Sequence, residues 1–260
     1  MKLYSDAECT NEIGTDATET LTVYAKGVSK GSATVTATSV ADETKTATCT
    51  VTVSKKAPSV GDFTYTAPNQ GFPTYDGTAK TATVVSKDGV NGMGTVTVHY
   101  YSDAGCTDEV QSPTDVGTYY VGITAEEGTS YSAVSGVLHG EGWKFTIGKA
   151  DPAVNAPTAK SLTYTGSAQE LVTAGEASGG EMQYALGTDA TNAPTSGYEA
   201  SIPTATDAGT YYVWYMVKGD SGHSDVAAKS LVVSIANKDI SSAKVTLSNT
   251  SFMYDNSEKM

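Results

Sequence analysis

Long hydrophobic runs are missing from this sequence of 260 residues. A membrane-spanning helix needs about 18 or more consecutive apolar residues, and no such run occurs, so we expect no membrane span in this fragment. The opening Met1-Lys2-Leu3-Tyr4 leads into no apolar core of the kind that signal peptides have. If the parent protein is exported, its signal and its anchor are expected to lie outside this fragment.

Positive charge is also scarce. The sequence holds 16 Lys and Arg against 29 Asp and Glu, which gives a formal net charge of -13. Such a chain is repelled by nucleic-acid phosphates and by anionic membrane surfaces. We therefore exclude nucleic acid as a partner.

Cysteine is rare, since only three residues occur and they cannot all pair within one chain. Cys49 continues an apolar alternation with Val51 and Val53, which predicts a core position where the thiol acts as a small hydrophobe. Cys9 and Cys106 have matching, turn-like surroundings. Inert thiols are the favoured interpretation, and a bridge between Cys9 and Cys49 is the alternative.

Residues in catalytic or metal-binding patterns are lacking as well. None of the three histidines, His99, His139 and His223, has a second His or Cys at zinc-ligand spacing. Neither a nucleophile elbow nor a Ser-His-Asp framework is visible. The sequence thus predicts a protein that is not an enzyme and needs no cofactor. Calcium stays open as an alternative to solvated surface charge at three acidic positions near module boundaries: Asp62, Asp151 and Asp239.

What the sequence does contain is a repeat. The segment Tyr75–Lys80 is followed by similar segments at Tyr164–Gln169 and Tyr254–Lys259, each about 90 residues further along. A second marker, Asp-Val-Gly-Thr-Tyr-Tyr-Val at 115–121, recurs as Asp-Ala-Gly-Thr-Tyr-Tyr-Val at 207–213. Two markers with one period indicate tandem modules of about 90 residues.

Within the modules, apolar residues alternate with polar ones at the period of β-strands. The alternating positions in the first of two similar modules are Val96, Val98, Tyr100, Tyr119, Val121, Ile123, Trp143, Phe145 and Ile147. Those in the next are Met182, Tyr184, Leu186, Tyr211, Val213, Tyr215, Val217, Leu231, Val233 and Ile235. No stretch has a convincing helical period, so the predicted class is all-β.

Two short motifs resemble the tyrosine corner of immunoglobulin-like domains. They are Asp115-x-Gly117-x-Tyr119 and Asp207-x-Gly209-x-Tyr211. In that fold a tyrosine near the start of strand F anchors the E to F corner through its hydroxyl, and a cysteine follows two residues later. Val121 and Val213 stand at the cysteine positions here. The resemblance implies sandwiches without a disulfide, as in bacterial surface proteins.

Residues 1–56 resemble the second half of a group 2 bacterial immunoglobulin-like domain. The likeness rests on the segments 30–37 and 45–53, and Tyr4–Thr10 also matches Tyr101–Thr107 of the next module. That family occurs in bacterial adhesins and cell-wall proteins, and the later modules resemble the Tyr-Asx-Gly repeats of similar large surface proteins. The implied location is extracellular or at the bacterial cell surface.

The repeat divides the chain into four predicted parts: a partial module of late strands (1–56), two full modules (57–149 and 150–237) and the opening strand of a further module (238–260). The expected linkers lie near 55–58, 148–152 and 236–239, and proline stiffens the first two. We therefore expect tandem immunoglobulin-like β-sandwich modules in an extended string.

One feature suggests a binding surface. If Tyr211, Val213 and Tyr215 point inward, then Tyr212 and Trp214 point outward. The corresponding face of the preceding module offers Tyr120 and Tyr101 beside His99. An exposed aromatic strip can stack on sugar rings or bury against a protein. The alternative is that these rings pack beneath a neighbouring loop or module.

Two functions follow as hypotheses. The first is a structural spacer or adhesion repeat region of a bacterial surface or secreted protein, with glycans or with host or envelope proteins as partners. The second is a carbohydrate-binding accessory region of a larger secreted enzyme.

The chain ends would also allow head-to-tail self-association, because the tail could add as a strand to the head of another copy. The residues buried in that contact would be Val245, Leu247 and Phe252 on Val23, Val35 and Val51. Loosely ordered ends are the alternative.

Overall fold

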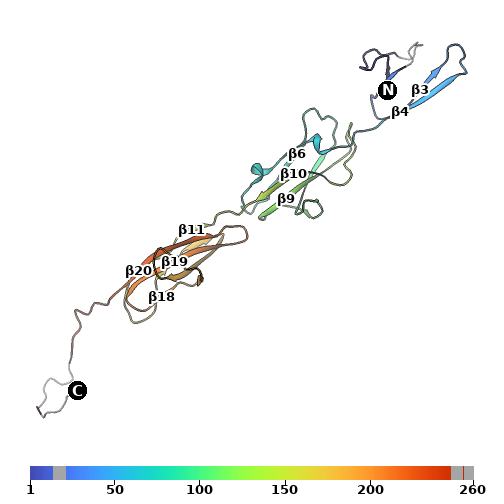
Figure 1. The fold of residues 1–260 in the computed structure, drawn as a ribbon. Helices are drawn as coiled ribbons and strands as arrows, with labels where there is room; N and C mark the ends of the chain where they lie inside the picture. The colour runs from blue at the N-terminus through green and yellow to red at the C-terminus, as the bar shows by residue number, and fades with distance from the viewer. Residues whose placement is uncertain (14–21, 247–253, 255–260) are drawn as a thin grey trace. The chain divides into compact units, whose positions relative to one another are not determined.

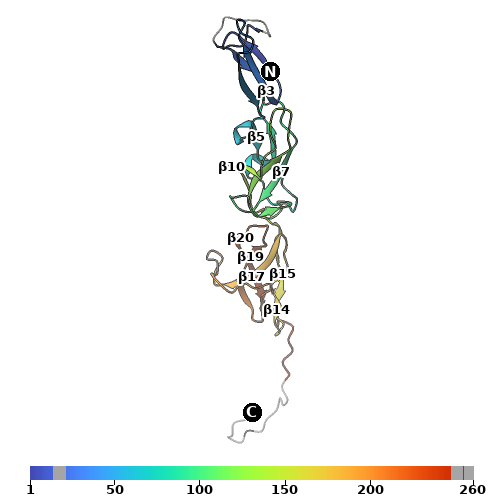
Figure 2. The same cartoon turned by 90° about the vertical axis from the view of Figure 1, so that its right-hand side faces the viewer.

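The structure is a computed structural model that describes residues 1–13, 22–246 and 254. It divides into two compact units: Met1–Pro73 with Thr78–Ile147, and Thr74–Gly77 with Gly148–Met260. Nearly all of the regular structure consists of strands (Figures 1 and 2). In the described ranges, short 3-10 segments occur at Val60–Asp62 and, with a kink inside it, at Pro68–Gly71. The all-β prediction is confirmed, and among the described residues there is no helix with the length and apolarity to cross a membrane.

The first unit begins with two small antiparallel sheets. In one, β1 (Lys2–Tyr4) pairs with β2 (Tyr24–Lys26). In the other, β3 (Gly31–Thr38) pairs with β4 (Thr46–Val53) over their full length. Because partners in an antiparallel pair share a face, β3 and β4 have one hydroxyl face and one apolar face. The hydroxyl face carries Ser32, Thr34, Thr36, Thr38, Thr46, Thr48, Thr50 and Thr52. The apolar face carries Ala33, Val35, Ala37, Ala47, Cys49 and Val51.

The prediction of Cys49 as a core residue is wrong, because the side chain is exposed. Its place in the alternation was read correctly, since Cys49 pairs with Val35 on the apolar face. The two strands form a sheet of their own, however. An inward-facing side chain is buried only if a second layer covers its face.

The rest of the first unit is a β-sandwich. One sheet pairs β5 (Phe63–Thr66) with β6 (Thr83–Ser86). The other has the order β10-β9-β7-β8, with bounds Leu138–Ile147, Gly117–Ala125, Val96–Tyr101 and Glu109–Val110. Alternate residues of β9 and β10 form the core, and Val121, Ile123 and Ile147 are fully buried. Phe63 of the small sheet meets Trp143 of β10 edge to face, with ring centroids 6.4 Å apart, which joins the two layers.

The second unit contains a similar sandwich, β11 to β20. Its main sheet has the order β13-β20-β19-β17, with bounds Leu162–Thr163, Val226–Ala236, Gly209–Gly219 and Gly180–Gly187. Three short pairs complete it: β11 (Ala153–Asn155) with β16 (Glu176–Ser178), β12 (Thr158–Ala159) with β15 (Val172–Thr173), and β14 (Gln169–Glu170) with β18 (Thr204–Ala205). Nine buried residues of this unit form one core cluster: Leu171, Val172, Met182, Tyr184, Val213, Tyr215, Val217, Val233 and Ile235.

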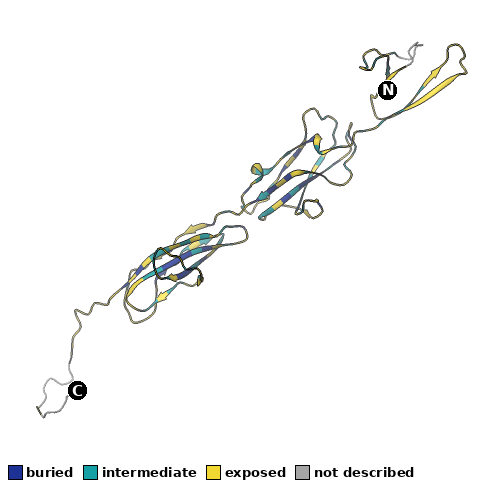
Figure 3. Cartoon of the chain, in the orientation of Figure 1, coloured by how far each residue is buried: buried dark blue, intermediate teal, exposed yellow. Residues whose placement is uncertain are grey.

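Buried residues lie along the central strands of both sandwiches (Figure 3). Leu186 was expected among them, and this expectation is wrong, since the side chain is 48 % exposed. It lies at the end of β17, an edge strand, where cover comes from one neighbouring strand only. Beyond β20, Lys244–Thr246 of the predicted opening strand are not in a strand, and Leu247–Met253 lie outside the described residues.

Candidate functional site

Both tyrosine motifs form a hydrogen-bonded corner. The Tyr119 hydroxyl donates to the Asp115 carbonyl at 3.0 Å, and the Tyr211 hydroxyl donates to the Asp207 carbonyl at 2.7 Å. This is the donor and the backbone acceptor that the corner interpretation requires. Gly117 and Gly209 lie next to these rings, since a β-carbon at either position would be in ordinary van der Waals contact with the ring, at 3.9 to 4.0 Å.

The electrostatics keep the corner of the first unit in its donating form. Burial, together with the nearby charge of Asp115, raises the pKa of Tyr119 above its ordinary value. A phenol that stays protonated remains a donor at all physiological pH values. These residues stabilise a chain reversal, and nothing about them is catalytic.

A second repeated motif, which contains Asp6 in one copy and Asp103 in the other, forms a similar loop in both places. The Asp103 carboxylate accepts hydrogen bonds from the backbone amides of Gly105, Thr107 and Asp108, at 2.7 to 2.9 Å. Asp6 does the same for the amides of Thr10 and Asn11. These backbone donors lower the pKa of both aspartates. We call the two segments, Ser5–Asn11 and Ser102–Asp108, the aspartate loops.

Each aspartate loop holds its cysteine in the left-handed backbone region, with φ 54° at Cys9 and 53° at Cys106. This conformation aims Cys106 into the protein, where it is 8 % exposed. Burial is the main cause that raises the pKa of its thiol, and Asp103 adds to it. A neutral, buried thiol is a poor nucleophile. All three cysteines are free in the structure, so the Cys9 to Cys49 bridge is not formed.

The prediction that Trp214 points into solvent is wrong. Its side chain is 5 % exposed, and its indole N–H donates to the Asp189 carbonyl at 3.0 Å. Asp189 anchors a loop of its own through the amides of Thr191 and Asn192, both at 2.7 Å. Trp214 does face away from the core, as the alternation predicts, but this loop folds over the outer face of the sheet and covers the ring.

Tyr101 is also covered, with only 4 % of its surface exposed, so the prediction that it forms part of an exposed strip is wrong for the same reason. The aspartate loop that follows Tyr101 turns back over the sheet. Tyr120 and Tyr212 are half-buried on the same outer faces. The structure therefore provides no continuous aromatic strip from the four predicted residues.

Instead, Tyr120 lies in a cavity that the sequence did not reveal. The cavity has a volume of about 240 Å³. The aspartate loop contributes Ala104 and Cys106 to its wall. The opposite wall comes from β10 and includes His139, Gly140, Glu141 and Trp143.

An irregularity in β10 creates this wall. His139 pairs with Gly122 and Lys144 pairs with Tyr120, so the whole segment 140–143 stands opposite the single residue Val121. Such a bulge bends the strand and redirects its side chains. The signal in the sequence was the run Gly140-Glu141-Gly142, which interrupts the alternation of apolar and polar residues along the strand.

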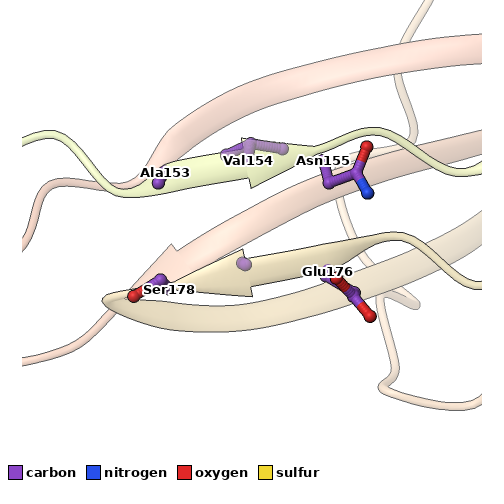
Figure 4. Close-up of a pocket in the computed structure, with 6 residues that line it drawn as sticks. Ala153, Val154, Asn155, Glu176 and Ser178 are labelled. Carbon is purple, nitrogen blue, oxygen red and sulfur yellow. The ribbon is translucent and has the colours of Figure 1, made fainter.

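A second hollow lies along the ribbon of β11 and β16 and has a volume of about 640 Å³ (Figure 4). Its lining is backbone and mostly small side chains, and Glu176 is the one charged residue in it. The labelled side chains in Figure 4 do not converge on a common point. A surface of this kind offers little to fix the orientation of a ligand.

Among the described residues, no group of three or more His, Cys, Asp or Glu side chains could hold a metal ion. Asp62, one of the positions left open for calcium, is instead bound to Lys56 Nζ at 2.6 Å and to the Ser59 hydroxyl at 2.7 Å. These contacts lower the pKa of Asp62 to about 2.

Comparisons with known proteins found little. No family model matches the chain, and no curated protein matches it. The chain is similar to a solved structure of the fibronectin(III)-like modules of CbhA from Clostridium thermocellum, with 13 % sequence identity and a TM-score of 0.26. That similarity covers 72 % of this chain and 99 % of the other.

Proposed function

We propose that the chain is a structural spacer or adhesion repeat region of a bacterial surface or secreted protein. In this proposal residues 57–149 and 150–237 are two full modules, residues 1–56 belong to a preceding module and residues 238–260 to a following one. The protein would act outside the cell or on its surface. Its partners would be host or envelope proteins or glycans, and it would not act as an enzyme.

One observation carries the proposal: the features that recur between the two sandwiches are structural. Tyr119 and Tyr211 make the same hydrogen bond to backbone at the same corner, four residues after their acceptors. By contrast, the polar residues around the cavity of the first unit lie on the bulge of β10, and β20 pairs with β19 without a break at the corresponding residues, Val213 and Trp214. Repetition of a scaffold without repetition of its side-chain chemistry is what a spacer requires.

The alternative, a carbohydrate-binding accessory region, was based on an exposed aromatic strip. Trp214 and Tyr101 are covered, so that basis is lost. An aromatic residue that keeps its ring beneath a loop stabilises the fold and cannot present a flat face to a sugar.

Self-association through the chain ends belongs to the same proposal. A strand from a second copy would pair with an edge of the sheet of β3 and β4 and bury its apolar side chains against the apolar face of that sheet. Val245 of the tail is 85 % exposed and available for such a contact, whereas Leu247 and Phe252 lie outside the described residues. A contact between different surfaces of two copies propagates from head to tail.

Small-angle X-ray scattering of the whole chain tests the spacer proposal. A compact globule of this length has a radius of gyration of about 18 Å. Two or more modules in series should give a radius of gyration well above that value. A scattering curve of a compact globule would contradict the proposal. Single-molecule stretching provides an independent readout, since two modules of similar length give two unfolding steps of similar length.

A further inference from the structure

The cavity between the aspartate loop and the bulge of β10 is unrelated to a spacer role. We propose that it is a binding site for a single neutral sugar ring. Four features of its lining support this proposal: an indole N–H open to the cavity, a bulge that keeps this group accessible, a mixed set of polar groups and a size below that of most ligand pockets.

Trp143 provides the first feature. Its ring is held rigidly, since it stacks on Tyr65 with centroids 5.8 Å apart and an interplanar angle of 18°. Only 8 % of the side chain is exposed. Among the described residues no acceptor is hydrogen-bonded to its Nε1, in contrast to Trp214, whose N–H is bonded to Asp189. This N–H is not among the buried polar atoms that lack a partner, so it is open to the cavity, where a ligand oxygen could accept a hydrogen bond from it.

Gly140 keeps this N–H accessible. A β-carbon at position 140 would stand 2.9 Å from both Cδ1 and Nε1 of Trp143, so any side chain there would cover the edge of the ring that carries the donor. Gly142, on the same bulge, has no atom within 4 Å of the corresponding point. Glycine is therefore needed at position 140 for the cavity and not merely for the bulge.

The remaining polar groups can both donate and accept. The lining also includes Tyr120, His139 and Glu141, of which His139 and Glu141 are exposed. A carboxylate accepts hydrogen bonds from hydroxyl groups, whereas an indole N–H donates to them. A ligand that satisfies both has many hydroxyls and no net charge. The net charge of -13 and Glu141 itself disfavour anions.

The size of the cavity limits the ligand to one ring. A volume of about 240 Å³ equals that of about eight water molecules and lies below the usual range for drug-sized ligands. Tyr120, which is half-buried, adds an aromatic surface against which the apolar C–H face of a sugar can pack.

Two-dimensional ¹H–¹⁵N spectra of the whole chain test the site, because the two tryptophans give one indole signal each. A Trp214→Phe variant assigns them. We expect neutral methyl glycosides at millimolar concentration to shift the Trp143 signal in a saturable way and to leave the Trp214 signal unmoved. Immobilised oligosaccharides that end in the best sugar then distinguish a glycan terminus from a free monosaccharide as the natural source.

Matched variants complete the test. Gly140→Ala should weaken binding about tenfold, which corresponds to the loss of one hydrogen bond, whereas Gly142→Ala should leave it unchanged. Glu141→Gln, at an exposed position, should also weaken it without affecting the fold. The proposal is overturned if no neutral glycoside shifts the Trp143 signal, if anions or aromatic compounds bind instead, or if the two glycine variants behave alike.

Discussion

Trp214 lies over Gly187, so closely that a β-carbon at position 187 would stand 2.5 Å from Cδ1 and Nε1 of the indole. The two residues are diagonal neighbours on paired strands, because Trp214 pairs with Ala185 and Gly187 pairs with Tyr212. The first unit has the reverse arrangement at the corresponding places. There Tyr101 of β7, the strand that matches β17, lies over Gly122 of β9, the strand that matches β19. A β-carbon at position 122 would stand 3.1 Å from Cε2 of Tyr101. At this pair of positions, each sandwich thus has an aromatic ring over a glycine, and the two residue types are exchanged between the strands.

Gly187→Ala should destabilise the second unit by about 1 to 3 kcal/mol, because the added methyl group forces the indole out of its place and away from Asp189. Thermal unfolding followed by circular dichroism measures the change. Gly148→Ala is the matched control, since nothing lies within 4 Å of its β-carbon position. Equal effects of the two substitutions would contradict the contact.

Tyr119→Phe and Tyr211→Phe should each destabilise their own sandwich by about 1 kcal/mol, the usual net contribution of a hydrogen bond. The loss should be larger at Tyr119, which is 8 % exposed, because its acceptor is left without a partner in a drier place. Chemical denaturation of the whole chain measures both. The neighbouring Tyr212→Phe is the control and should change little.

Asp62→Asn should lower the melting temperature at neutral pH and have little effect in strong acid. The folded pKa of Asp62, about 2, lies below the ordinary value of 3.8. A group of this kind stabilises the fold fully above the unfolded pKa and loses its effect as the pH falls through the folded pKa. The difference between the two proteins should therefore shrink from about pH 4 to about pH 2. A difference that is constant over this interval would contradict the ion pair with Lys56. Asp88→Asn, at an exposed position, is the control.

Removal of all three thiols should leave both sandwiches folded, since none of them is paired. The suitable variant combines Cys9→Ser, Cys49→Ala and Cys106→Ala. Only Cys106 is buried, so we expect a loss of about 1 kcal/mol in the first unit and none in the second. Calorimetry with and without a reducing agent measures both, and unfolding of either sandwich in the variant would show that a disulfide matters.

A chain that ends at Asn237 should be monomeric at concentrations where the intact chain forms larger species. The tail residues that would add to β3 and β4 of another copy are then missing. Multi-angle light scattering over a range of concentrations gives both masses. Equal monomeric masses for the two proteins at high concentration would eliminate strand exchange.

The sequence was informative where a structural rule is local. Alternation along one strand predicts which residues face inward, and Val213, Tyr215 and Val217 are all buried in the core cluster. The corner motif is equally local, since donor and acceptor are four residues apart. Such features depend on a few neighbouring dihedral angles and little else.

The prediction was wrong where burial depends on a distant segment. Trp214 and Tyr101 do face outward from the core, and each is covered by a loop whose path no strand pattern reveals. Cys49 shows the opposite case, because its strand has the expected face but no second layer over it. The cavity beside Trp143 was missed because the bulge that shapes it becomes visible only once the register of β9 and β10 is known.

The exchange of ring and glycine between the two sandwiches has a consequence for folding. Neighbouring modules of similar sequence risk mispairing, in which a strand of one module enters the sheet of the next. If β7 paired with β19, Tyr101 and Trp214 would compete for the same space. If β17 paired with β9, Gly187 and Gly122 would meet and leave a void. Both mixed sheets are therefore less stable than the correct ones, and the aromatic rings help each repeat to recognise its own strands.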